Sequence, residues 1–277
     1  MDDSGYTPSA KYSSVYPACV ERIAAEESHK HKNTRDRERA VRNRLYQITG
    51  AYAAQGSAAR SFERSLDGRL SALSSFMDES SFGSLTDESA LLSWCADSLA
   101  AHTSTRERLS VLVEFYGFLK DTCADAKTIA DYGCGLNPFA LPLWKPSGLV
   151  RYDAYDVDMR SVEYANALFR RLGLPESAAA CDLVAETPAG STDAALLLKL
   201  LPVLDMQRAG RGIELLRQVS SHIKVVSYPL SGLSGTQRAR RIDGTAARFE
   251  REAAAAGIAI AHSRRIGSEM VYVVSSN

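Results

Sequence analysis

Acidic residues and glycines spaced along the middle of the chain indicate a site for a nucleotide-like ligand. An apolar run ends in the pattern Asp-x-Gly-x-Gly, with Asp131, Gly133 and Gly135. Glycines after a strand let the main chain pass close to a ligand. Asp156 ends the next apolar run, where a carboxylate can accept from both hydroxyls of a ribose. The pattern is not Gly-x-Gly-x-x-Gly and no Walker lysine follows it, so it favours a ligand with a ribose and an amino-acid tail, such as S-adenosylmethionine.

The same residues have structural alternatives that involve no ligand. The glycines could form a tight turn between a strand and a helix without any ligand. If a ligand binds, Asp131 could order this loop or meet the ammonium group of the ligand. Asp158 could cap a helix that begins at residue 159, which leaves Asp156 as the ribose partner. Asp182 ends a third run. It could accept from an adenine amino group while the amide of Leu183 donates to a ring nitrogen, or it could cap a helix or be an ordinary acid of a loop.

Basic side chains flank these acids in the sequence. Lys199 interrupts an apolar run. Because an unpaired buried lysine is costly, we expect Lys199 to reach the pocket or an anionic partner, or to extend to solvent at the end of its strand. Ser104 and Glu107 have the spacing of a capping box at the start of a helix. Arg108, on the first turn of that helix, could meet a ligand carboxylate with its planar guanidinium.

A parallel sheet is needed to bring these residues together. After about residue 105, candidate strands and helices alternate at the spacing of βαβ units, which predicts a mostly parallel sheet covered on both faces. The expected strands are 128–132, 150–156, 178–182, 193–199, 223–228, 257–263 and 270–275, and the expected helices are 159–172, 207–221 and 244–256. The last two strands should form an antiparallel hairpin at one edge. The fold class is therefore α/β, with the Rossmann-like sheet of an S-adenosylmethionine-dependent methyltransferase.

Residues 1–104 are predicted to be helical and to form a separate N-terminal domain. Apolar residues recur at helical spacing on both sides of the basic stretch 29–44, which holds seven Lys or Arg against two acids. This stretch and a second basic cluster at 238–241 could bind RNA phosphates or be solvated faces. The candidates for RNA contact are Lys30, Lys32, Arg35, Arg37, Arg42, Arg44, Arg238, Arg240 and Arg241.

Composition excludes several other classes of protein. The formal net charge is zero, so affinity for nucleic acid must come from local patches. The five cysteines are scattered without a C-x-x-C pair, which argues against a disulfide framework and a zinc site, and we expect no metal. Without an apolar N-terminal region or an apolar run of about 18 residues, we expect no secretory signal, no membrane span and a cytoplasmic protein.

Six distinctive segments occur in order along the chain. They are HTSTRER at 102–108, CGLNP at 134–138, YDVD at 155–158, LLLKLLP at 196–202, VVSYP at 225–229 and GSEM at 267–270. In order and spacing they resemble the aminoglycoside-resistance 16S ribosomal RNA methyltransferases of the Arm/Rmt type over residues 102–276. The motifs KY at 11–12 and GAY at 50–52 extend the likeness. The loop 230–238 keeps Gly, Ser and Arg but departs from the family's wording.

The resemblance implies that residues 1–104 dock on the small ribosomal subunit and that residues 105–277 form the methyltransferase domain. It implies methylation of N7 of guanine 1405 of 16S rRNA (standard ribosomal numbering) with S-adenosylmethionine, which confers aminoglycoside resistance. Carried over by position, the cofactor-binding residues are Tyr52, His102, Thr103, Ser104, Arg108, Gly133, Gly135, Asp156, Asp182, Leu183, Leu198 and Gln207.

The expected reaction needs no catalytic acid or base. Guanine N7 carries a free lone pair, so positioning is enough, and Lys199 would contribute to it. The expected partner is 16S rRNA in the assembled 30S subunit, bound by a monomer. The alternatives are methylation of adenine 1408 at N1, which has a proton to lose, a ribosome-binding protein that keeps the cofactor without turnover, and a small-molecule methyltransferase.

Overall fold

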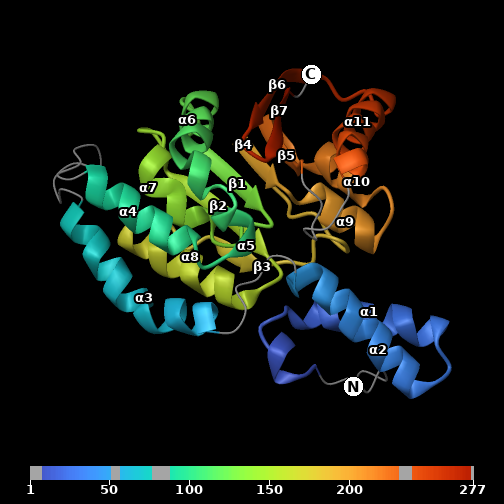
Figure 1. The fold of residues 1–277 in the computed structure, drawn as a ribbon. Coiled ribbons are helices and arrows are strands. Elements are labelled where there is room, and N and C mark those ends of the chain that lie inside the picture. Colours follow the sequence, from blue (N-terminus) through green and yellow to red (C-terminus); the bar gives the residue numbers. More distant parts are fainter. Residues whose placement is uncertain (1–7, 51–56, 77–87, 231–238, 276–277) are drawn as a thin grey trace.

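A seven-stranded sheet forms the centre of the molecule (Figure 1). The computed structural model describes residues 8–50, 57–76, 88–230 and 239–275. The strand order is β3-β2-β1-β4-β5-β7-β6, and pairing is parallel except that β7 runs antiparallel to both β5 and β6. The strands are β1 (Thr128–Tyr132), β2 (Arg151–Asp156), β3 (Ala178–Ala180), β4 (Ser191–Leu198), β5 (Ser220–Pro229), β6 (Ile260–Ile266) and β7 (Glu269–Ser275). The predicted parallel sheet and its antiparallel edge hairpin are confirmed.

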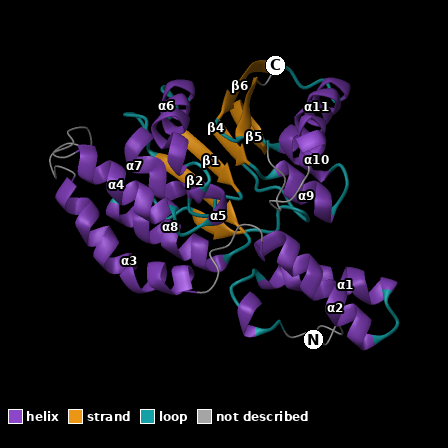
Figure 2. Cartoon of the chain, in the orientation of Figure 1, coloured by secondary structure: helices purple, strands orange, loops and turns teal. Residues whose placement is uncertain are grey.

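Helices cover both faces of this sheet (Figure 2). One face packs against α3 (Ser57–Phe76), α4 (Glu88–Leu99), α6 (Leu112–Thr122), α7 (Leu141–Trp144) and α8 (Met159–Arg171). The other face packs against α9 (Leu201–Gln207), α10 (Arg211–Gln218) and α11 (Ala239–Ala255). The short helix α5 (Thr103–Arg106) precedes α6. The doubly covered sheet explains why residues 194–198 of β4 read as an unbroken apolar run, since all five are buried.

The helix α6 before the sheet buries one face. Leu112, Phe115, Tyr116 and Leu119, at the spacing of one helical face, are all buried. The predicted helix 207–221 is present as the shorter α10, because α9 ends at Gln207 and β5 already begins at Ser220. The short helix α9 begins soon after β4 and was not expected. Pro202 occupies its first turn, where the fixed φ and missing N–H of proline are well tolerated.

The first hundred residues contribute to two different cores. Residues 8–50, here called the α1–α2 unit, contain α1 (Pro17–Lys30), α2 (Thr34–Leu45) and a π-helical turn, η2 (Tyr46–Gly50), and they form their own apolar cluster. The helices α3 and α4 instead share the core of the sheet, through residues such as Phe62 and Trp94. In Figure 1 the α1–α2 unit lies beside the end of the sheet, apart from α3 and α4.

Cysteines and apolar segments complete this description. All five cysteines are buried as free thiols. Among the described helices, none combines the length and the apolar character that crossing a bilayer requires.

Candidate cofactor-binding site

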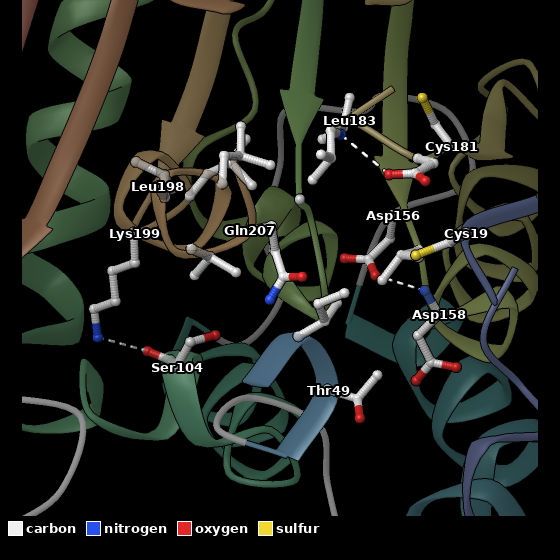
Figure 3. Close-up of a pocket in the computed structure, with 18 of the residues that line it drawn as sticks. Cys19, Thr49, Ser104, Asp156, Asp158, Cys181, Leu183, Leu198, Lys199 and Gln207 are labelled. Carbon is white, nitrogen blue, oxygen red and sulfur yellow. Dashed lines mark hydrogen bonds between the residues drawn. The ribbon is translucent and has the colours of Figure 1, made fainter. Parts of the chain in front are cut away.

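A pocket opens at the carboxyl ends of the parallel strands, where α/β proteins bind ligands (Figure 3). It leaves about 820 Å³ free of protein atoms, open mouth included, which suits a ligand of nucleoside size. Many residues predicted from the sequence line it: His102, Ser104, Gly133, Asp156, Asp182, Leu183, Leu198, Lys199 and Gln207. Figure 3 shows Asp156 and Leu183 on one side, Leu198 and Lys199 on the other, and Gln207 between them.

The loop after β1 requires both of its glycines. Gly133 and Gly135 have φ of +69° and +49°, a region that other residues rarely adopt. A Cβ at Gly133 would lie 2.8 Å from Cδ1 of Leu200, and a Cβ at Gly135 would lie 3.1 Å from Cε1 of His102. Gly133 lines the pocket, whereas Gly135 packs against His102 and does not line it. The loop is therefore fixed in a shape that keeps the main chain of residue 133 open to the pocket.

Asp131 orders this loop from below. Its Oδ2 atom accepts from Nδ2 of Asn137 at 2.8 Å and from the hydroxyl of Tyr152 at 2.9 Å. Asn137 in turn accepts at Oδ1 from the hydroxyl of Tyr116 at 2.9 Å. Burial raises the pKa of Asp131 to about 6, although both hydrogen bonds oppose the shift. Of the two roles weighed for Asp131, the structure gives it the loop-ordering one.

Asp156 stands at the end of β2 with its carboxylate in the pocket wall. Its Oδ2 accepts from the amide of Gly135 at 2.7 Å, and its Oδ1 accepts from the amide of Asp158 at 2.8 Å. Each oxygen keeps a further acceptor site, which is what two neighbouring hydroxyls need. Burial, and then the charge of Asp158, raise the pKa of Asp156 to about 6 against these two hydrogen bonds. Asp158 itself caps α8, as predicted.

Asp182 is held by a residue that the sequence analysis missed. Arg22 of α1 donates from Nε to Oδ2 at 2.6 Å and from Nη2 to Oδ1 at 3.2 Å, across 160 residues of sequence. The amide of Val184 also donates to Oδ1, at 3.1 Å, but within a turn, because no helix lies between Asp182 and the start of β4 at Ser191. The predicted helix cap at Asp182 is therefore wrong. Arg211 of α10, buried, donates from Nε to the carbonyl of Leu183 at 2.7 Å and fixes the next residue of the wall.

Lys199 joins a buried ionic cluster below the pocket. Its backbone has φ of +57°, unusual for a residue with a side chain. Its Nζ lies 2.6 Å from Glu107 and 3.1 Å from Glu269, and it donates to the carbonyl of Ser104 at 3.2 Å. Lys199 therefore has anionic partners, one of the alternatives expected. Because Glu107 is drawn to Lys199, the predicted capping box is wrong, and Ser104 lies inside α5 instead of capping it.

Glu269 of β7 is the centre of this cluster and is a second residue that the sequence analysis missed. Arg108 donates to its two oxygens from Nε at 2.8 Å and from Nη2 at 3.0 Å, and Ser227 donates to Oε2 at 2.7 Å. Burial acts to raise the pKa of Glu269, but Arg108 and then Lys199 hold it below its ordinary value. The cluster fastens the segment 102–108 to the sheet.

Some predicted residues do not reach the pocket wall. Arg108 is engaged by Glu269, and neither it nor Thr103 lines the pocket, so direct cofactor contact stays a prediction for both. Tyr52 and Arg238 lie outside the described residues. Arg240 and Arg241 fall on the first turn of α11, whose backbone alone is described there.

The basic side chains of residues 29–44 differ in how exposed they are and in their partners. Lys32 and Arg35 are exposed, and Lys30 and Arg42 are largely exposed while pairing with acids of their own helices. Arg37 is half-buried. Arg44 differs, because its side chain is only 13% exposed and it faces acids of α1 and the pocket residue Gln207. Arg44 thus contacts a pocket residue without lining the pocket, and RNA contact stays a prediction for it.

The polar and apolar groups of the pocket fit a nucleoside with an extended tail. One side offers the carboxylates of Asp156 and Asp182, and the other is apolar, with Leu198, Leu200 and Val203. Within the described ranges, no three His, Cys, Asp or Glu side chains are grouped to hold a metal ion.

Comparisons with known proteins agree with this geometry. A family profile described as "Ribosomal RNA methyltransferase (FmrO)" matches residues 8–273. A 16S rRNA (guanine(1405)-N(7))-methyltransferase of Micromonospora echinospora is 31% identical over 98% of this chain and 94% of its own, and one of Proteus mirabilis is 28% identical over 96% and 93%. The crystal structure of 16S rRNA methyltransferase RmtF in complex with S-adenosyl-L-homocysteine matches with a TM-score of 0.79 and 30% identity, over 97% of this chain and 94% of that one.

Proposed function

The chain belongs to the FmrO family of ribosomal RNA methyltransferases, and from this premise we propose that it methylates N7 of guanine 1405 of 16S rRNA and so confers aminoglycoside resistance. The observation that carries the proposal is the grouping of Gly133, Asp156 and Asp182 around one pocket at the carboxyl edge of the sheet. The cofactor is S-adenosylmethionine, whose demethylated product occupies the related RmtF structure.

We assign each cofactor contact from the chemistry of the pocket residue that would make it. Asp156 would accept from the two ribose hydroxyls, because both of its oxygens are fixed by backbone amides and keep free acceptor sites. Asp182 would accept from the adenine amino group, beside the Leu183 wall. Gly133 would let the methionine tail pass against the main chain.

The residues need only to orient the reactants and exclude water. When bound, S-adenosylmethionine supplies an electrophilic methyl group on its sulfonium. Guanine N7 has an unprotonated lone pair, so no side chain has to remove a proton before attack, and near-attack positioning supplies the rate. The apolar side chains of Leu198 and Leu200 would keep water from this part of the pocket. The target base must leave its stack to enter.

We further propose that the enzyme acts as a monomer on the assembled 30S subunit and that, within residues 1–104, docking belongs to the α1–α2 unit. The methyltransferase domain then comprises residues 105–277 together with α3 and α4, which share the core of its sheet. The exposed basic side chains Lys32 and Arg35 support docking on rRNA phosphates. Lys30, Arg37 and Arg42 belong to the same basic surface.

A comparison of substrates tests this proposal. Purified protein is incubated with radiolabelled S-adenosylmethionine and either intact 30S subunits or protein-free 16S rRNA. We expect label on 16S rRNA in the 30S reaction, at a higher rate than on the free RNA. A protein that binds S-adenosyl-L-homocysteine but labels neither RNA contradicts the ribosomal substrate.

A further inference from the structure

The α1–α2 unit forms part of the pocket itself. Cys19, Ile48 and Thr49, all from this unit, line the pocket beside the strand-end residues. The backbone is tied to the loop that follows Asp156, because the amide of Tyr16 donates to the carbonyl of Val157 at 2.8 Å. A second tie runs from the amide of Met159 to the carbonyl of Ser14, also at 2.8 Å.

Apolar packing does little to hold this unit in place. In the described part of the chain, its apolar cluster is made of its own residues, and Val157 is the one outside side chain packed against it. The position of the α1–α2 unit relative to the sheet must therefore depend on polar contacts. Because hydrogen bonds and ion pairs depend on geometry, they can couple the position of this unit to the shape of the pocket.

The strongest polar contact is the fork between Arg22 and Asp182. Both side chains are largely shielded, with exposed fractions of 16% and 5%, so solvent weakens this pair less than a surface pair. The guanidinium and the amide of Val184 fix the plane of the carboxylate, and they leave capacity for about one further donor. One amino hydrogen of an adenine ring would use that capacity.

This contact is the first link in a chain of ion pairs and hydrogen bonds whose other end also lies at the pocket. Arg22 donates from Nη1 to Glu26 at 3.0 Å, and Glu26 pairs with Arg44 of α2. Arg44 donates from Nε to Oε1 of Gln207 at 3.0 Å. Both ends of the chain, Asp182 and Gln207, line the pocket, and the middle lies on the unit that carries the basic surface.

We propose that Arg22 is a positioning residue that aims Asp182 at the adenine amino group, and that the α1–α2 unit thereby sets cofactor affinity. The proposal rests on the proposed function, since it concerns the same cofactor. It also makes 30S docking and cofactor binding interdependent. A coupling between two binding sites acts equally in both directions, so cofactor must change 30S affinity by the factor by which 30S changes cofactor affinity.

The first test measures recognition of the amino group. Calorimetry gives the affinities of full-length protein for S-adenosyl-L-homocysteine and for S-inosyl-L-homocysteine, which has an oxo group in place of the adenine amino group. We expect Arg22→Met to weaken the first ligand by about tenfold and the second by less than about twofold. Arg22→Lys should restore part of the difference. Arg39→Met, an exposed position on α2, is the matched control and should change neither affinity.

Several outcomes separate positioning from a general structural role. A mere loss of structure weakens both ligands alike, so an unchanged affinity ratio in Arg22→Met overturns the proposal. If Arg22 acts through Asp182, the Arg22→Met change has almost no further effect in an Asp182→Asn background, and additive losses contradict it. If the wild-type protein binds no S-adenosyl-L-homocysteine, the proposed function fails. If wild type and Arg22→Met bind it equally, only this inference fails.

A second test measures the coupling to the ribosome. The affinity of the protein for 30S subunits is determined with and without saturating S-adenosyl-L-homocysteine. We expect the cofactor product to change 30S affinity in the wild type, and to change it less in Arg22→Met at a concentration that still saturates the variant. A wild-type 30S affinity that ignores the ligand, or an equal response in the variant, overturns the coupling.

Discussion

Replacing Glu269 by glutamine should destabilise the protein far more than the same change at Glu107. Glu269 is buried and receives donors from Arg108, Lys199 and Ser227. Glutamine keeps the volume but removes the charge, and its amide nitrogen must face one of these donors. Arg108 loses the carboxylate that it is paired with, whereas Lys199 keeps Glu107 at 2.6 Å.

The size of the effect follows from the burial of the cluster. Removing one partner of a buried ion pair costs about 3–5 kcal/mol in the free energy of unfolding. With an unfolding entropy of about 2.1 cal/mol/K per residue, the 277 residues convert this cost into a fall in Tm of roughly 5–9 °C. Glu107 is 49% exposed, so Glu107→Gln should cost less than about 1 kcal/mol, or roughly 2 °C.

Urea unfolding followed by circular dichroism, together with thermal melts, measures both variants beside the wild type. An unchanged slope of unfolding free energy against urea would show that stability alone has changed. The reasoning is refuted if Glu269→Gln lies within about 1 kcal/mol of the wild type, or if the two variants lose equal stability.

Three further predictions concern the pocket and the docking surface. Asp156→Asn should weaken S-adenosyl-L-homocysteine binding by roughly 10- to 100-fold, because an ionised acceptor is lost; calorimetry that finds less than twofold excludes Asp156 as the ribose partner. In the wild type, the carboxylate with a pKa of about 6 must be ionised to accept from both hydroxyls, so affinity should hold above pH 7 and fall about tenfold between pH 7 and pH 5. The same titration should be nearly flat in Asp156→Asn, and a flat wild-type profile argues against the assignment. Neutralising Lys32 and Arg35 together should lower the methylation rate on 30S subunits and reduce its salt dependence, with cofactor affinity unchanged; a loss of cofactor binding would remove these residues from the docking surface.

The sheet could be predicted from the sequence because its strands are buried on both faces. Such strands read as short apolar runs, and their ends mark the edge where ligands bind, so Asp131, Asp156 and Asp182 could be placed along the carboxyl edge. The first two predicted strand ends agree with the structure to the residue. Failures occurred where a short element carries little pattern of its own, as with α9, which lies almost entirely outside the expected helices.

The partners of the site residues could not be predicted in this way. Arg22 meets Asp182 across 160 residues, and Arg108 meets Glu269 across 161, so no window of sequence contains either pair. In the sequence, Arg22 is a lone arginine on an amphipathic helix, and nothing beside it marks it as a partner of Asp182. Glu269 is part of a segment that carries the family resemblance, but its role depends on β7 lying beside β5.

Methylation of N7 of guanine 1405 can be tested directly by mapping the methylated base. Pure protein is incubated with intact 30S subunits and S-adenosylmethionine, and the 16S rRNA is then treated with borohydride and aniline, which cleave the chain at N7-methylguanine. We expect a single enzyme-dependent cleavage at guanine 1405 that is absent without cofactor. Methyl incorporation without this cleavage would contradict the assigned base or atom, and adenine 1408 would be the next position to examine.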